Sequence, residues 1–203
     1  MDIFFVCILA ALFSYVIGSI PIAYLVGRKV ESVDVREVGE GNVGARNVFH
    51  TVGHKWGSLV FLGDFGKGMI VASAVSDQSK YVMGLSGFFL FLGHGFPVWL
   101  KFLGGKGLSP VGGFTATLLP LSSLLGIGIS ALVWLFVRRF MPTTVTVIIC
   151  AIGLAPFFGY SISRILIPIG LFVMVGAKRK LDEPRTRKIE GRNDWNRLTG
   201  GMV

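Results

Sequence analysis

Residues 39–47 read Gly-Glu-Gly-Asn-Val-Gly-Ala-Arg-Asn, a polar, glycine-rich stretch in a chain that is otherwise very apolar. Glycine lets backbone N–H groups approach a ligand closely, and runs of such groups form concave sites for anions. We therefore expect the rest of the chain to build a membrane scaffold whose cytoplasmic rim presents this loop to phosphorylated substrates. The alternative interpretation is a flexible linker between two helices.

The composition is typical of an integral membrane protein. Of the 203 residues, 52% are hydrophobic and only 15% are charged, whereas soluble domains carry about 25% charged residues. Apolar segments follow one another near residues 3–26, 57–75, 81–100, 108–119, 121–137, 143–159 and 161–177. We predict an all-α polytopic membrane protein with seven transmembrane helices, forming a single domain over residues 1–203. Pro120 predicts a break between the fourth and fifth segments, and the fourth is shorter than the roughly 20 residues of a full span.

The distribution of positive charge predicts the orientation of the chain. The net charge is +9, and of the 20 Lys and Arg residues all except Lys80 and Arg164 fall on one side of the seven-span arrangement. Cytoplasmic loops of membrane proteins gather Lys and Arg. We therefore expect the N-terminus outside, the C-terminus in the cytoplasm, and residues 178–203 to form a basic cytoplasmic tail that contributes to the site. An alternative for the tail is a basic anchor attracted to anionic lipids.

Three polar clusters are expected on this cytoplasmic face, and the loop at residues 39–47 is the first. In the second, near the start of the second apolar segment, Asp64 and Lys67 are spaced to pair on one helix face, as a structural ion pair or as functional groups. Lys106, between glycines at residues 104–107, offers a point charge and backbone donors that suit a phosphate. His94 is expected to be a structural hydrogen-bonding residue. The third cluster is the tail segment at residues 191–198.

Several familiar chemistries are excluded by the sequence. Both Lys67 and Lys106 are followed by glycine, so the chain has no nucleotide-binding P-loop. No histidine is followed four residues later by aspartate, which excludes the usual His–Asp acyltransferase motif. The three histidines are not accompanied by other ligands at the spacing of a zinc site, and the two cysteines lie in apolar segments. We expect neither a metal nor a cofactor.

Short motifs follow one another along nearly the whole chain: Gly18–Ser19–Ile20–Pro21, Asp34–Val35–Arg36, Gly39-x-Gly41–Asn42-x-Gly44–Ala45-x-Asn47, Asp64-x-x-Lys67–Gly68, Gly93–His94-x-Phe96–Pro97, Gly104–Gly105–Lys106–Gly107 and Arg197–Leu198. Each motif alone is weak, but the ordered set is highly specific. It resembles the acyl-phosphate:glycerol-3-phosphate acyltransferase family, PlsY.

The resemblance implies an enzyme of the bacterial cell membrane with its active face in the cytoplasm. It would move a fatty acyl group from acyl phosphate to the 1-hydroxyl of glycerol 3-phosphate, giving lysophosphatidic acid. The partners would be these two substrates and membrane lipids, without nucleic acid. The residues implied as catalytic are Lys106, Asn42 and Asp194. Those implied in binding substrate phosphate are Gly41, Gly44, Arg46, Asn47, His50, Gly105, Gly107, Arg192 and Arg197.

The chain departs from the family at several of these positions. Family members usually have Ser, Thr and Arg where this chain has Glu40, Arg46 and His50, and His-Arg-Glu-Asn where it reads Gly-Arg-Asn-Asp at residues 191–194. Glu40 places a negative charge where an anion should bind. We expect Arg46 to neutralise it or to replace the missing arginine, with Arg46 and Lys106 converging on one pocket and Glu40 turned away.

These departures keep two further hypotheses open. The first is an enzyme on the same scaffold with a changed acceptor or donor. The second is a non-catalytic paralogue that binds lipid or a partner.

Overall fold

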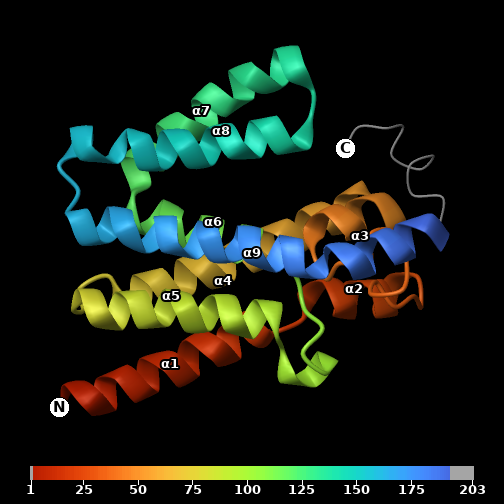
Figure 1. The fold of residues 1–203 in the computed structure, drawn as a ribbon, viewed down its shortest axis with the longest axis horizontal. Coiled ribbons are helices and arrows are strands. Elements are labelled where there is room, and N and C mark those ends of the chain that lie inside the picture. The colour runs from red at the N-terminus through yellow and green to blue at the C-terminus, as the bar shows by residue number, and fades with distance from the viewer. Residues whose placement is uncertain (1, 193–203) are drawn as a thin grey trace.

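The computed structural model describes residues 2–192, and these residues are arranged as a bundle of helices (Figure 1). The elements, in chain order, are α1 (Ile3–Ser19), α2 (Ile22–Val30), α3 (Ala45–Thr51), α4 (His54–Val75), α5 (Lys80–Gly95), the short 3-10 helix η1 (Val98–Leu100), α6 (Leu108–Leu118), α7 (Pro120–Val137), α8 (Phe140–Gly153), the 3-10 helix η2 (Ala155–Phe158) and α9 (Ile162–Arg192). The all-α prediction is confirmed.

Two prolines divide apolar stretches of the chain into separate helices. α7 begins at Pro120, directly after α6 ends, and this is the break that the sequence predicts. A second break, at Ile20–Pro21, divides the first apolar segment into α1 and the short α2, although the hydropathy of residues 3–26 predicts one continuous segment. The cause is the same, because proline has no N–H to donate and holds the residue before it in an extended conformation. Ile20 is extended accordingly.

The last helix is much longer than the apolar segment at residues 161–177. α9 continues through the first part of the basic tail and ends at Arg192 (Figure 1). Ion pairs one helical turn apart, Lys178 with Asp182 and Arg187 with Glu183, lie along this extension, and such i,i+4 pairs stabilise a helix. The tail is therefore an ordered element up to residue 192.

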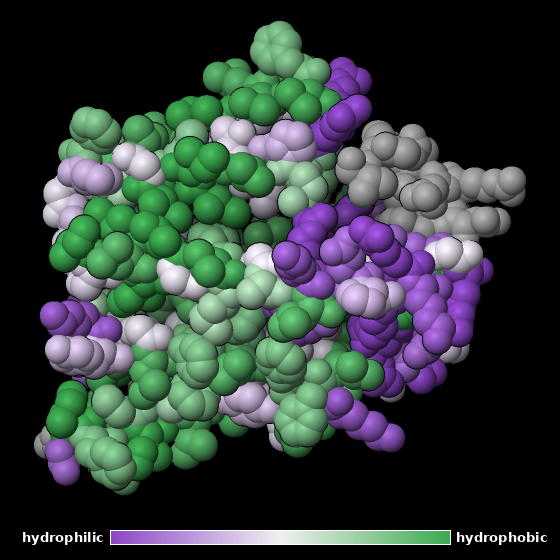
Figure 2. Space-filling view, viewed as in Figure 1, coloured by the Kyte–Doolittle hydropathy of each residue, from purple (hydrophilic) through white to green (hydrophobic). Residues whose placement is uncertain are grey.

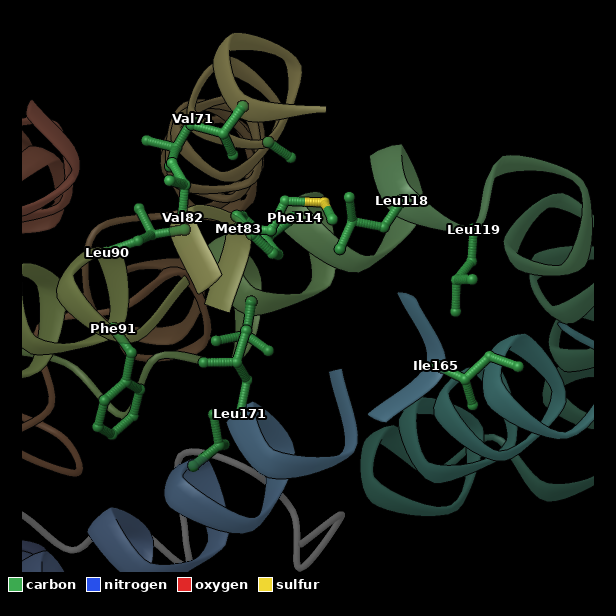
Figure 3. Close-up of a cluster of buried hydrophobic side chains, with 14 of the residues drawn as sticks. Val71, Val82, Met83, Leu90, Phe91, Phe114, Leu118, Leu119, Ile165 and Leu171 are labelled. Carbon is green, nitrogen blue, oxygen red and sulfur yellow. The ribbon is translucent and has the colours of Figure 1, made fainter. Parts of the chain in front are cut away.

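Small residues let the helices of the bundle approach closely. A Cβ added to Gly18 of α1 would overlap the Leu90 carbonyl of α5, and one added to Gly68 of α4 would overlap the Pro110 carbonyl of α6. Glycine at helix contacts is typical of membrane bundles, where close backbone packing replaces the hydrophobic effect. The main core cluster fills the space between α4, α5, α6 and α9, with Phe114 at its centre (Figure 3).

The surface divides by polarity along the long axis of the molecule. Apolar side chains cover most of the visible face, and hydrophilic residues gather at the end where α3 and the C-terminal part of α9 lie (Figures 1 and 2). Among the described residues 2–192, four helical stretches, at residues 3–30, 54–75, 80–100 and 120–137, are long and apolar enough to cross a membrane. The protein is thus an integral membrane protein with several apolar helices, and the count of seven spans stays a prediction.

Candidate active site

The loop at residues 39–47 is folded around the buried side chain of Asn47. The Asn47 side-chain amide donates to the carbonyls of Val35 at 2.7 Å, Asn42 at 3.0 Å and Val38 at 3.1 Å. Its carbonyl oxygen accepts the backbone N–H of Glu40 at 3.1 Å. All its polar atoms are thereby engaged with the loop backbone, and Asn47 is fully buried. The side chain predicted to bind phosphate instead holds the loop in shape.

Two glycines give this loop its tight curvature. Gly39 and Gly41 have φ values of +60° and +63°, in the left-handed region that other residues avoid. A Cβ at Gly41 would also overlap Ile189 of α9. Gly41 therefore serves both the turn and the contact with the C-terminal helix. Gly44 is extended and precedes α3 as its N-cap, and the side-chain amide of Asn42 lies over it.

Glu40 lies between the two basic side chains that the sequence singled out. Its Oε2 is 3.1 Å from Lys106 Nζ and 3.7 Å from Arg46 Nη1, and the residue is only 3% exposed. Arg46 and Lys106 do converge, but they converge on Glu40. The expectation that Glu40 turns away is wrong, because a buried carboxylate must be paired with positive charge to offset its desolvation.

The loop that carries Lys106 is packed against the end of α5. Gly104 donates its N–H to the Gly95 carbonyl at 3.2 Å, and Gly105 donates to the His94 carbonyl at 3.0 Å. A Cβ on Gly105 would overlap both His94 Nε2 and the Val43 carbonyl of the first loop. The N–H of Gly105, predicted to bind phosphate, is thus already engaged. Gly107, with φ of +88°, begins α6 as its N-cap.

Arg36 joins the two loops from the side of α2. Its guanidinium forms an ion pair with Asp34, with Nη2 2.7 Å from Oδ2, and Nη1 donates to the Leu100 carbonyl at 3.2 Å. The hydrogen bond from Arg36 lowers the pKa of the Asp34 carboxyl below its ordinary value. The Asp-Val-Arg motif therefore fixes the loop at residues 39–47 relative to the loop at residues 96–107.

The C-terminal part of α9 covers the first loop through Arg185 and Ile189, two residues of the tail that the sequence did not single out. Arg185 donates from Nη2 to the Gly41 carbonyl, and Ile189 packs on Gly41. Glu190 follows one residue later, and burial followed by the nearby charge of Glu40 raises the pKa of its carboxyl. The sequence signal that could have indicated this contact is a continuation of the last helix into the tail, with Ile189 on its buried side.

A second polar centre lies deeper in the bundle. Lys67 Nζ is 2.6 Å from Asp64 Oδ1 and also donates to the Ile20 carbonyl at the α1–α2 break. Both side chains are buried, so the expected ion pair is present, but it lies in the middle of α4 because that helix begins at His54. Asp64 and His94 line a small cavity beside Pro21. This centre braces the helix break.

The comparisons with known proteins agree on one family. The family model described as glycerol-3-phosphate acyltransferase matches residues 8–183. Glycerol-3-phosphate acyltransferase 1 of Dehalococcoides mccartyi is 34% identical over 183 residues, covering 86% of this chain and 88% of the relative. The chain belongs to the glycerol-3-phosphate acyltransferase family. It is accordingly an integral membrane acyltransferase of phospholipid synthesis.

Other relatives and solved structures of this family extend the match. The glycerol-3-phosphate acyltransferase of Bacillus subtilis is 40% identical over 114 residues, 56% of this chain and 59% of the relative. A crystal structure of PlsY (YgiH), an integral membrane glycerol 3-phosphate acyltransferase in its glycerol 3-phosphate form, matches with a TM-score of 0.76 and 31% identity, covering 92% of this chain and 94% of that chain. A lysophosphatidic acid form of PlsY matches with a TM-score of 0.74.

Of the remaining predicted site residues of this family member, some lie within the described residues and some lie outside them. His50 lies on α3 near Arg46, and burial, followed by the charge of Arg46, lowers the pKa of its imidazole and so disfavours its positively charged form. Arg192 is exposed at the end of α9. Asp194 and Arg197 lie outside the described residues. Within residues 2–192, no three His, Cys, Asp or Glu side chains are grouped as a metal site would require.

Proposed function

We propose that this family member transfers a fatty acyl group from acyl phosphate to the 1-hydroxyl of glycerol 3-phosphate, giving lysophosphatidic acid. One observation carries the proposal at the level of the site. Arg46, on the first turn of α3, and Lys106, in the loop before α6, converge on a single carboxylate within 3.7 Å. Two cations gathered beside a glycine-rich loop form a place for an anion, and both proposed substrates carry phosphate.

The proposed reaction needs positioning and charge stabilisation more than a protein nucleophile. An acyl phosphate is a mixed anhydride, so its carbonyl carbon is already activated. The hydroxyl oxygen of the acceptor attacks this carbon, the bond from carbon to the phosphate oxygen breaks, and a phosphate oxygen takes the hydroxyl proton. The gain comes from alignment of the two substrates and from positive charge on the departing phosphate.

The roles of individual residues follow from their positions. Lys106 Nζ offsets charge on the departing phosphate, and Arg46, beside the first loop, holds the phosphate of the acceptor. The side-chain amide of Asn42 lies over Gly44 at the mouth of the same loop and orients the hydroxyl. Arg192, Asp194 and Arg197 of the tail complete the substrate side of the site. Neither a metal nor a cofactor enters this scheme.

The same proposal includes the orientation of the protein in the membrane. Seven spans place the N-terminus outside and residues 178–203 in the cytoplasm of a bacterial cell, with the whole chain forming one domain. Hydrophilic residues gather at the end of the molecule where α3, which carries Arg46, lies (Figures 1 and 2), and this supports the arrangement. Both phosphorylated substrates would then be met on the cytoplasmic face.

The test is an acyltransfer assay on detergent-purified protein, with acyl phosphate and labelled glycerol 3-phosphate and without acyl-CoA. We expect lysophosphatidic acid, and we expect Lys106→Ala to lower kcat by about 100-fold or more, as loss of one charge-stabilising donor typically does. Lys55→Ala, at an exposed position at the start of α4, is the matched control and should retain activity. A folded wild-type protein that makes no more product than Lys106→Ala refutes the proposal.

Glu40 favours one second candidate, an enzyme on this scaffold with a different acceptor or donor. A carboxylate on both cations weakens the attraction for a doubly charged phosphate. A screen of hydroxylated phosphates as acceptors, read by product mass, separates the two candidates. Binding of phosphate esters without turnover on any acyl donor would instead indicate a non-catalytic paralogue.

A further inference from the structure

We propose that Glu40 is a built-in counter-charge that lowers the affinity of this site for doubly charged phosphates and so determines which anions the site retains. The inference rests on the proposed function, because it concerns the same two cations. It assigns a specificity-determining role to a residue that neither transfers a proton nor contacts the reacting carbon.

The position of the Glu40 carboxylate is set by the loop fold. The backbone N–H of Glu40 is held by Asn47 Oδ1 at 3.1 Å, and the glycines on either side, Gly39 and Gly41, have left-handed conformations. These constraints fix the backbone of Glu40, and the ion pairs with Lys106 and Arg46 hold its carboxylate.

The exposed fractions of the three side chains differ. The Glu40 side chain is 4% exposed, whereas those of Arg46 and Lys106 are 15% and 17% exposed. The two cations are therefore more accessible to a ligand than the carboxylate that pairs with them, although the Arg46 guanidinium also packs over the Phe140 ring. An incoming phosphate can contact Arg46 and Lys106 while Glu40 stays in place.

The electrostatic consequence depends on the charge of the ligand. Arg46 and Lys106 bring two positive charges, and Glu40 reduces their sum to one. Because Coulomb energy is proportional to the ligand charge, the weakening is about twice as large for a dianion as for a monoanion. Glu190 on α9 is a second carboxyl near Glu40, and Lys106, Arg46 and Arg179 are cations that also act on it. Release of phosphate-bearing products is correspondingly easier.

The test compares binding of two tetrahedral anions to wild type and to Glu40→Gln, by calorimetry in detergent at pH 8 and low salt. Inorganic phosphate is the dianion and methanesulfonate is the monoanion. Glutamine keeps the size of the side chain and an oxygen that can accept from Lys106. We expect Glu40→Gln to bind phosphate at least tenfold more tightly and methanesulfonate about threefold more tightly. Glu31→Gln removes the same charge at an exposed position and should bind both anions as wild type does.

The outcomes separate this inference from the proposed function. Unchanged or weaker phosphate binding by Glu40→Gln, or an equal gain for both anions, overturns the inference. Should Glu40→Gln fold poorly, Glu40→Asp draws the carboxylate back by one methylene and should show a smaller gain of the same kind. If the wild type performs acyltransfer but Glu40→Gln binds phosphate no more tightly, the proposed function stands without this inference. If Glu40→Gln gains phosphate affinity as expected but the protein performs no acyltransfer, this inference stands without the proposed function.

Discussion

Asn47 is the residue on which the glycine-rich loop depends. Three carbonyls and one N–H from the surrounding backbone converge on its amide. Val35 and Val38 are twelve and nine residues before it, so no helical or strand periodicity connects them to it. The sequence predicts a candidate site from its glycines and asparagines, but it could not tell a ligand-binding amide from one engaged with the backbone.

We expect Asn47→Ala to lower the free energy of unfolding by about 2–3 kcal/mol, because it leaves several buried backbone groups without partners. Thermal unfolding in detergent measures the change. The same variant should also lose phosphate binding, since the loop beside Arg46 is no longer held in shape. Gln78→Ala, at an exposed turn position, is the control. Wild-type stability in Asn47→Ala would show that the loop is held by other contacts.

Helices of this protein end where backbone chemistry requires, and hydropathy reveals only some of these ends. The break at Pro120 could be predicted because this residue separates two recognisable apolar segments. Pro21 lies within one unbroken apolar run, so the hydropathy pattern concealed the break that its missing N–H causes. Hydropathy also did not reveal the extension of α9 to Arg192, because the residues of this extension are charged and resemble a solvated tail. The contact of Arg185 with Gly41 joins residues far apart in the chain, which one sequence cannot reveal.

The ion pair within α4 gives a prediction at the scale of elements. Lys67→Met leaves Asp64 as an unpaired buried charge and removes the donor to the Ile20 carbonyl, so we expect a loss of about 3–5 kcal/mol in the free energy of unfolding. The double variant Asp64→Leu/Lys67→Met removes both charges and should recover at least half of that loss. Thermal unfolding of the two variants in detergent tests this. Equal stability of Lys67→Met and wild type would contradict a bracing role.

The molecule as a whole is polarised from end to end. The turn between α4 and α5 lies at the end opposite to α3 and to the C-terminal part of α9 (Figure 1). If the end that carries Arg46 and Lys106 faces the cytoplasm, only the opposite end is accessible to a reagent added outside the cell. The charge distribution predicts this orientation.

Cysteine labelling in intact cells tests the orientation. Gln78→Cys, in the α4–α5 turn, should react with a membrane-impermeant thiol reagent added outside. Lys29→Cys, at the exposed end of α2, should react only after the cells are opened. Each replacement is made in a background where Cys7 and Cys150 are serine. The reverse pattern would place the site outside the cell.

The short α6 has a consequence for the depth of the site in the proposed seven-span arrangement. Its 11 residues extend about 17 Å, whereas the hydrocarbon core is about 30 Å thick. α7, which follows at once, is long enough to cross, so in that arrangement the α6–α7 junction would lie at one surface and Lys106 would lie below the other. Residues 96–107 would then form a re-entrant loop, which is tolerated at membrane depth only where protein satisfies its backbone, as His94 and Gly95 do for Gly105 and Gly104. In the proposed reaction, the acyl phosphate could react without its chain leaving the hydrocarbon, and the water-soluble acceptor would descend to meet it.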